Sequence, residues 1–100
     1  MSSSNISSVT KTADAAAISG RTRVVGIYYT CTGTGSSFSL KNGSTSGGTA
    51  LVSITTPGAA GGYDIIIPDM GILFDSGVFV DVGDAEVTSV TLFFQGGAAA

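Results

Sequence analysis

Apolar and polar residues alternate with a period of two along most of the chain after residue 20, as expected for strands with one buried face. Phe38 and Leu40 alternate with polar neighbours, and Val78, Val80 and Val82 do the same further on. The alternating segments are rich in β-branched and aromatic residues, while Gly, Pro, Asn and Asp lie between them. The pattern predicts about seven strands, at 21–31, 37–41, 49–55, 63–67, 72–75, 78–82 and 87–94.

The longest of these segments, 21–31, has apolar residues on both of its faces. Val25, Ile27 and Tyr29 share one face, together with Cys31, and Val24 and Tyr28 lie on the other. Such a strand is typical of the centre of a sheet, or of a sheet whose second face meets a partner. Gly26, inside the segment, indicates a bulge or a close approach of another backbone.

The spacing of the predicted strands defines the fold class. No segment has a convincing helical period of 3.6 residues, and short strands at intervals of about 8–12 residues are typical of sandwiches and barrels. We therefore expect an all-β protein with a single antiparallel β-sandwich, jelly-roll or immunoglobulin-like, two topologies that the pattern does not separate. The expected organisation is an N-terminal arm (1–19), a sandwich domain (20–95) and a short C-terminal tail (96–100).

The expected arm is rich in Ser, Thr and Ala, and its large apolar residues are Ile6, Val9 and Ile18. Two interpretations remain open for it. It could be a flexible tail, which is the usual behaviour of chain termini. Alternatively, it could be an extended arm that becomes ordered on a partner, with the three apolar residues as anchors.

Composition excludes several classes of function. The chain of 100 residues has no His, one Cys and four Lys plus Arg, with a formal net charge of -3. It therefore lacks an imidazole base, an internal disulfide and the basic surface that nucleic-acid backbones require. Its apolar runs are far shorter than the roughly 20 residues of a membrane-spanning helix. We expect neither nucleic acid nor membrane as a partner.

Candidate chemical sites are few. Asp81, Asp84 and Glu86 surround one turn and could bind Ca²⁺, but their spacing matches no EF-hand and a solvated turn explains them better. Cys31 has no His partner and is interpreted as a small buried residue. We expect no catalytic, cofactor-binding or metal site, and hence no enzyme. A weaker hypothesis is a stacking surface for sugars or bases, formed by Tyr28 and Tyr29 with Arg21 and Arg23, although core packing explains the tyrosines better.

The order of motifs resembles that of small structural proteins of tailed bacteriophages. The similar segments are RTRVVGIYYT, FSLKNGSTSGGTALVSITTP, YDIIIPDMGILFDSGVFVDV and VTSVTLFF, which together span about residues 20–95. The resemblance lies in the succession of strands and turns, and it implies a β-sandwich on the virion, often a capsid decoration (cement) protein or a tail or fibre component. It carries no catalytic residues, and the segment before residue 20 has no counterpart in it.

We therefore expect a capsid decoration protein that binds the outside of the shell and stabilises it by bridging subunits. The expected partners are the major capsid protein or other virion subunits, and further copies of the chain in a homotrimer or another symmetric oligomer. Low charge and apolar residues on both faces of one strand favour such extensive burial. The residues expected at the interface are Ile6, Val9, Ile18, Arg21, Arg23 and Tyr28. The alternatives are a tail- or fibre-associated protein, a module that binds host glycans, or a pilus-like subunit that exchanges its N-terminal segment as a strand.

Overall fold

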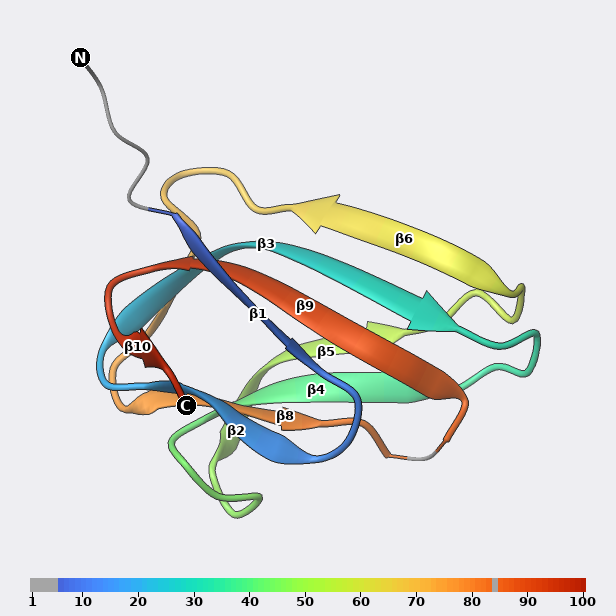
Figure 1. Cartoon of the computed structure of the whole chain (residues 1–100), viewed down its shortest axis with the longest axis horizontal. Helices are drawn as coiled ribbons and strands as arrows, with labels where there is room; N and C mark the ends of the chain where they lie inside the picture. Colours follow the sequence, from blue (N-terminus) through green and yellow to red (C-terminus); the bar gives the residue numbers. More distant parts are fainter. Residues whose placement is uncertain (1–5, 84) are drawn as a thin grey trace.

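The computed structural model describes residues 6–83 and 85–100, which form ten strands in two antiparallel sheets packed as a β-sandwich (Figure 1). The all-β prediction is therefore confirmed. The strands are β1 (Ser7–Lys11), β2 (Ala15–Ser19), β3 (Thr22–Cys31), β4 (Ser37–Asn42), β5 (Thr49–Thr55), β6 (Gly61–Ile66), β7 (Ile72–Phe74), β8 (Gly77–Asp81), β9 (Val87–Gln95) and β10 (Ala98–Ala99). All seven predicted strands are among them, with bounds that differ by at most two residues.

The two sheets have five strands each. In the sheet named sheet A here, the order is β1-β9-β3-β6, and β7 pairs with β3 beside β6 on the same edge. In sheet B the order is β10-β2-β8-β4-β5. The chain changes sheet at most connections, so that β1 pairs with β9, β2 with β8 and β3 with β6, while β4 and β5 form a hairpin.

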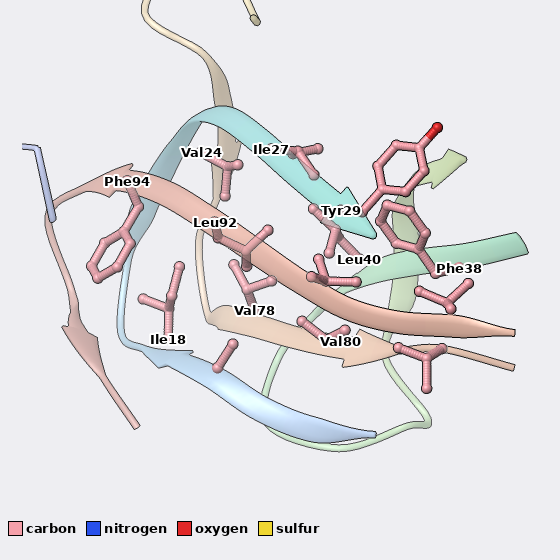
Figure 2. Close-up of a cluster of buried hydrophobic side chains, with 14 of the residues drawn as sticks. Ile18, Val24, Ile27, Tyr29, Phe38, Leu40, Val78, Val80, Leu92 and Phe94 are labelled. Atoms are coloured by element: carbon pink, nitrogen blue, oxygen red, sulfur yellow. The ribbon is translucent and has the colours of Figure 1, made fainter. Parts of the chain in front are cut away.

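The core lies between the two sheets, and Figure 2 shows its side chains pointing into this space from both. Tyr29 lies in it, with its ring centroid 5.2 Å from that of Phe38 and 5.5 Å from that of Tyr63. Burial raises the pKa of the Tyr29 hydroxyl. The residues of this core that are essentially inaccessible to solvent include Ala17, Ile18, Val24, Ile27, Leu40, Phe74, Val78, Val80, Val87, Val90 and Leu92.

Strand β3 occupies the centre of sheet A, as predicted, and contains the bulge that Gly26 indicated. The register with β9 shifts between Val24 and Gly26. Because of this extra residue, Val24 is buried with Ile27 and Tyr29, whereas simple alternation placed it on the opposite face. The prediction that placed Val24 on the opposite face was therefore wrong, because the backbone bulge shifts the alternation at this point.

Residues 7–19 do not form the expected extended N-terminal arm. β1 pairs with β9 at the edge of sheet A, and β2 pairs with β8 inside sheet B, so the two strands belong to the sandwich (Figure 1). Ala17 and Ile18 are fully buried, and Val9 packs against the core. The Ser- and Ala-rich composition concealed these strands because small residues carry a weak strand signal of their own. Residues 1–5 of the expected arm lie outside the described residues.

The last residues also join the sandwich. Ala98 and Ala99 form β10, which pairs with β2, and the backbone N–H of Ala100 donates a 2.9 Å hydrogen bond to the carbonyl of Ala17. The segment expected as a tail therefore covers one edge of sheet B.

Candidate interaction face

The outer face of sheet A carries several exposed aromatic and aliphatic side chains. Register places residues of four strands in rows across it. One row consists of Ser8, Phe93, Gly26 and Ile66, named the apolar row here. The next row consists of Thr10, Thr91, Tyr28 and Asp64. Two neighbouring rows of this face thus combine aromatic, aliphatic and hydroxyl-bearing side chains.

The aromatic rings on this face lie over glycines. A Cβ atom added to Gly62 would lie 2.0 Å from the Tyr28 hydroxyl oxygen and 2.6 Å from the Cζ atom of the ring. A Cβ atom on Gly26 would lie 3.4 Å from Cδ2 of Phe93. The two glycines therefore let the rings lean across neighbouring strands. Tyr28 is 40% exposed and Phe93 38% exposed.

The edge of the face is interrupted between β6 and β7. The N–H of Ile67 still bonds to the carbonyl of Val25, and pairing resumes at Ile72 opposite Val24. In between, the chain leaves the sheet in a turn closed by the N–H of Gly71 bonding to the carbonyl of Pro68 at 3.1 Å. Asp69 and Met70 have φ values of 57° and 68° there, which are costly for residues with a Cβ atom.

This turn and the adjacent end of β6 carry the most exposed large apolar side chains among the described residues. Ile66, in the apolar row, is 82% exposed, and Met70 is 68% exposed. Leaving apolar area in water forgoes stabilisation of about 25 cal/mol per Å². Exposed apolar residues gathered in one region make it a candidate for contact with a partner.

Two opposite charges lie on the same face. Arg23 lies opposite Gln95 and Leu73, on one side of the apolar row, and Asp64 lies opposite Tyr28 on its other side. The hydroxyls nearby pair with each other: Thr10 with Thr91 at 2.7 Å, and Thr30 with Ser89 at 2.6 Å. Within residues 6–83 and 85–100, neither Arg23 nor Asp64 takes part in an ion pair.

Sheet B presents a different outer face. Its Lys41 and Asp81 form an ion pair at 2.8 Å. The Lys41 ammonium, with the backbone N–H of Gly83, holds the pKa of Asp81 below its usual value. Near one end of this face lies an open hollow of about 190 Å³ lined by serines, Phe38, Asp81 and Gly83. These charges are already compensated within the chain.

The structure separates the residues predicted for an interface. Ile18 is buried in the core, and Val9 is partly buried against it, so these two are structural. Ile6 is 48% exposed before β1, and Arg21 is exposed before β3. Arg23 and Tyr28 share the outer face of sheet A, whereas Tyr29 points into the core and cannot form part of a sugar-stacking surface.

Sequence reasoning missed Phe93, Ile66 and Met70. Phe93 alternates with the inward Leu92 and Phe94, so its outward position could have been read from the pattern. Ile66 was concealed by the uninterrupted run of three isoleucines. Met70 could not be found, because nothing in the sequence signals that the turn projects from the edge of a sheet.

The described residues contain no group of three or more His, Cys, Asp or Glu side chains that could surround a metal ion. Of the acidic residues considered for Ca²⁺, Asp81 pairs with Lys41, Glu86 accepts a hydrogen bond from Thr32, and Asp84 lies outside the described residues. Cys31 is buried, as expected, and its thiol lies 3.5 Å from the carbonyl of Ala59. Across the part of the chain that the structure describes, no helix has the length and apolar character needed to span a membrane.

Comparison with known proteins adds no relative. The sequence matches no protein-family model, and searches of curated proteins and of solved structures found no significant match.

Proposed function

We propose that the chain is a structural protein of a tailed-phage particle, a decoration protein that binds the outside of the capsid shell and stabilises it by bridging subunits. The observation that carries this proposal is the outer face of sheet A, where Tyr28, Phe93 and Ile66 are exposed together beside Met70. Covering such a face on assembly releases the free energy that its exposure costs.

Strand order supports the proposal. With β7 and β10 set aside, the pairings of β1 with β9, β2 with β8, β3 with β6 and β4 with β5 are those of one long hairpin folded into two sheets. We interpret the sandwich as a jelly roll, an architecture common in viral capsid and lectin domains. The resemblance of residues 20–95 to phage structural proteins points in the same direction, although fold alone does not define function.

The size of the chain is consistent with a role in an assembly. A domain of 100 residues buries a comparatively small core, and binding of the folded state to a partner adds stability by mass action. The contacts between a decoration protein and the shell would stabilise both the folded chain and the shell.

The proposal is tested on particles of the virus whose genome encodes the chain. We expect mass spectrometry of purified particles to find the protein at a fixed ratio to the major capsid protein, and particles that lack it to disassemble at lower temperature. Absence from the particles would reject the proposal. Presence in a few copies would favour the tail- or fibre-associated alternative.

A glycan-binding module is the second candidate, because Tyr28 lies across Gly62 with Asp64 opposite it. An aromatic ring can stack on the apolar face of a sugar, and a carboxylate can accept hydrogen bonds from sugar hydroxyls. In this case Tyr28→Ala would abolish binding on a glycan array without a large loss of thermal stability. If the wild-type chain binds no glycan on the array, this candidate is wrong.

A further inference from the structure

We propose that two copies of the chain associate through the outer face of sheet A, about a two-fold axis that follows the apolar row, with Arg23 of each copy paired to Asp64 of the other. The inference deepens the proposed function by naming a second copy as the subunit that covers this face, and the dimer then contacts the shell through its remaining surface. It rests on that function only in treating the face as an assembly surface.

The two charges occupy defined positions on the face. Arg23 lies on β3 in the row of Gln95 and Leu73, and Asp64 lies on β6 in the row of Tyr28 and Thr91. The apolar row, with Phe93, Gly26 and Ile66, runs between them. The positive and negative groups therefore lie on opposite sides of the most apolar line across the face.

A two-fold axis along that line exchanges its two sides. It places Arg23 of one copy over Tyr28 of the other, one strand away from Asp64, and the same contact forms a second time by symmetry, as in every isologous interface. Because Arg23 and Asp64 lie on neighbouring strands, the axis must tilt slightly from the row, and the facing sheets then rotate relative to each other. Packed sheets in sandwiches are rotated in this way, by about 30°.

The apolar row contributes the second part of the interface. Ile66 and Phe93 are the exposed large apolar side chains of this row, and the Phe93 ring lies over Gly26 between the two strands. Their burial against the same row of a second copy would provide the apolar centre, and the reciprocal ion pairs would fix its orientation.

The local charges of the face, and not the net charge of the chain, favour a second copy as the occupant. The chain has a formal net charge of -3, so two copies repel each other at long range. On the outer face of sheet A, the opposite charges of Arg23 and Asp64 sum to zero. Neither residue has an ion-pair partner within residues 6–83 and 85–100. On sheet B, Lys41 and Asp81 already neutralise each other within one chain. The outer face of sheet A thus offers the opposite charges that a second copy complements.

Charge reversal tests this arrangement with the purified full chain in sedimentation equilibrium. We expect the wild type to dimerise, and we expect Arg23→Asp or Asp64→Arg alone to weaken dimerisation by roughly tenfold or more, because like charges then meet twice. The double variant Arg23→Asp/Asp64→Arg exchanges the partners and is expected to restore the dissociation constant to within roughly threefold. Lys11→Asp is the matched control and should leave dimerisation unchanged, because the Lys11 ammonium bonds to the carbonyl of Ala100 beside sheet B and does not lie on the outer face of sheet A.

Circular dichroism and urea unfolding establish that each variant is folded, which we expect because both side chains lie on an outer face. A wild-type chain that remains monomeric up to about 1 mM would overturn the inference. So would a dimer that the single reversals do not weaken, or single reversals that the double variant does not rescue. Particle binding is measured separately: a monomeric chain that still binds particles contradicts the dimer alone, and a dimer absent from particles contradicts the decoration function alone.

Discussion

At the scale of single residues, glycines determine how close the strands and rings can approach. Gly71 has φ +80°, and a Cβ atom there would lie 2.2 Å from the carbonyl oxygen of Val24. Gly62 has an ordinary φ, and its Cβ atom would meet only the end of the Tyr28 side chain, which can swing away. The two glycines therefore serve different purposes: one permits a backbone turn, and the other permits a ring position.

Alanine at these two positions should separate the effects. Gly71→Ala combines left-handed strain with a backbone clash, so we expect it to lower the free energy of unfolding by about 2 kcal/mol or more. Gly62→Ala should cost less than about 1 kcal/mol, because only a side chain must move. Urea unfolding of both variants measures the difference, and equal losses would contradict this assignment.

Two surface carboxylates make stability depend on pH. Hydrogen bonds from the Asn42 amide, foremost, and from Ser76 lower the pKa of Asp75, and Lys41 lowers that of Asp81. The folded pKa is in both cases below the unfolded value of about 3.9. Their contribution to stability is therefore complete above about pH 4 and is lost as the pH falls through the folded pKa.

Replacement of one carboxylate should reduce this dependence. Asp81→Asn cannot titrate and loses the ion pair with Lys41, so we expect a less stable protein at pH 7 whose stability falls less between pH 5 and pH 2. Urea midpoints measured across that range for both proteins provide the comparison. Parallel pH profiles would show that Asp81 does not contribute as described.

At the scale of elements, β1 and β2 integrate the N-terminal segment into both sheets. β1 covers the outer edge of β9 in sheet A, and β2 lies between β8 and β10 in sheet B. Asp14, between the two strands, accepts a 2.8 Å hydrogen bond from the backbone N–H of Val82. The segment is therefore part of the folded domain, and its removal would expose two sheet edges together.

Truncation distinguishes a domain strand from a dispensable arm. A chain that begins at Gly20 loses the buried Ala17 and Ile18 and the partners of β8 and β9, so we expect it to be largely unfolded by circular dichroism. A chain that begins at Ile6 keeps both strands and is the control, with the cooperative melting of the full chain. A folded, stable Gly20 variant would contradict the structural role of β1 and β2.

The strands in which apolar and polar residues alternate strongly were the ones that the sequence predicted. Strands such as Thr49–Thr55 were predicted with their observed bounds because β-branched and apolar residues mark them clearly. The strands Ser7–Lys11 and Ala15–Ser19 were not predicted, because their small residues acquire strand structure from pairing with β9 and β8. For the interaction face, the sequence pointed to Arg23 and Tyr28, whereas the row that joins Phe93, Gly26 and Ile66 depends on long-range register that no local pattern contains.

At the scale of the whole molecule, the account rests on the contrast between the two outer faces. Sheet B compensates its charges internally through Lys41 and Asp81, and β10 covers one of its edges. Sheet A exposes Tyr28, Phe93 and Ile66 beside an interrupted edge, whereas among the described residues of the sheet B strands Leu51 is the exposed large apolar side chain. We propose that the sandwich works as a subunit whose sheet A face is covered by a partner.

The most direct test of the proposed decoration role is a cryo-electron microscopy reconstruction of the tailed-phage particles on which we propose that the chain assembles. The account predicts regular density for this sandwich on the outside of the shell, with the outer face of sheet A, including Tyr28, Ile66 and Phe93, buried against another subunit. Particles in which the chain is absent, or in which this face is open to solvent, would contradict it.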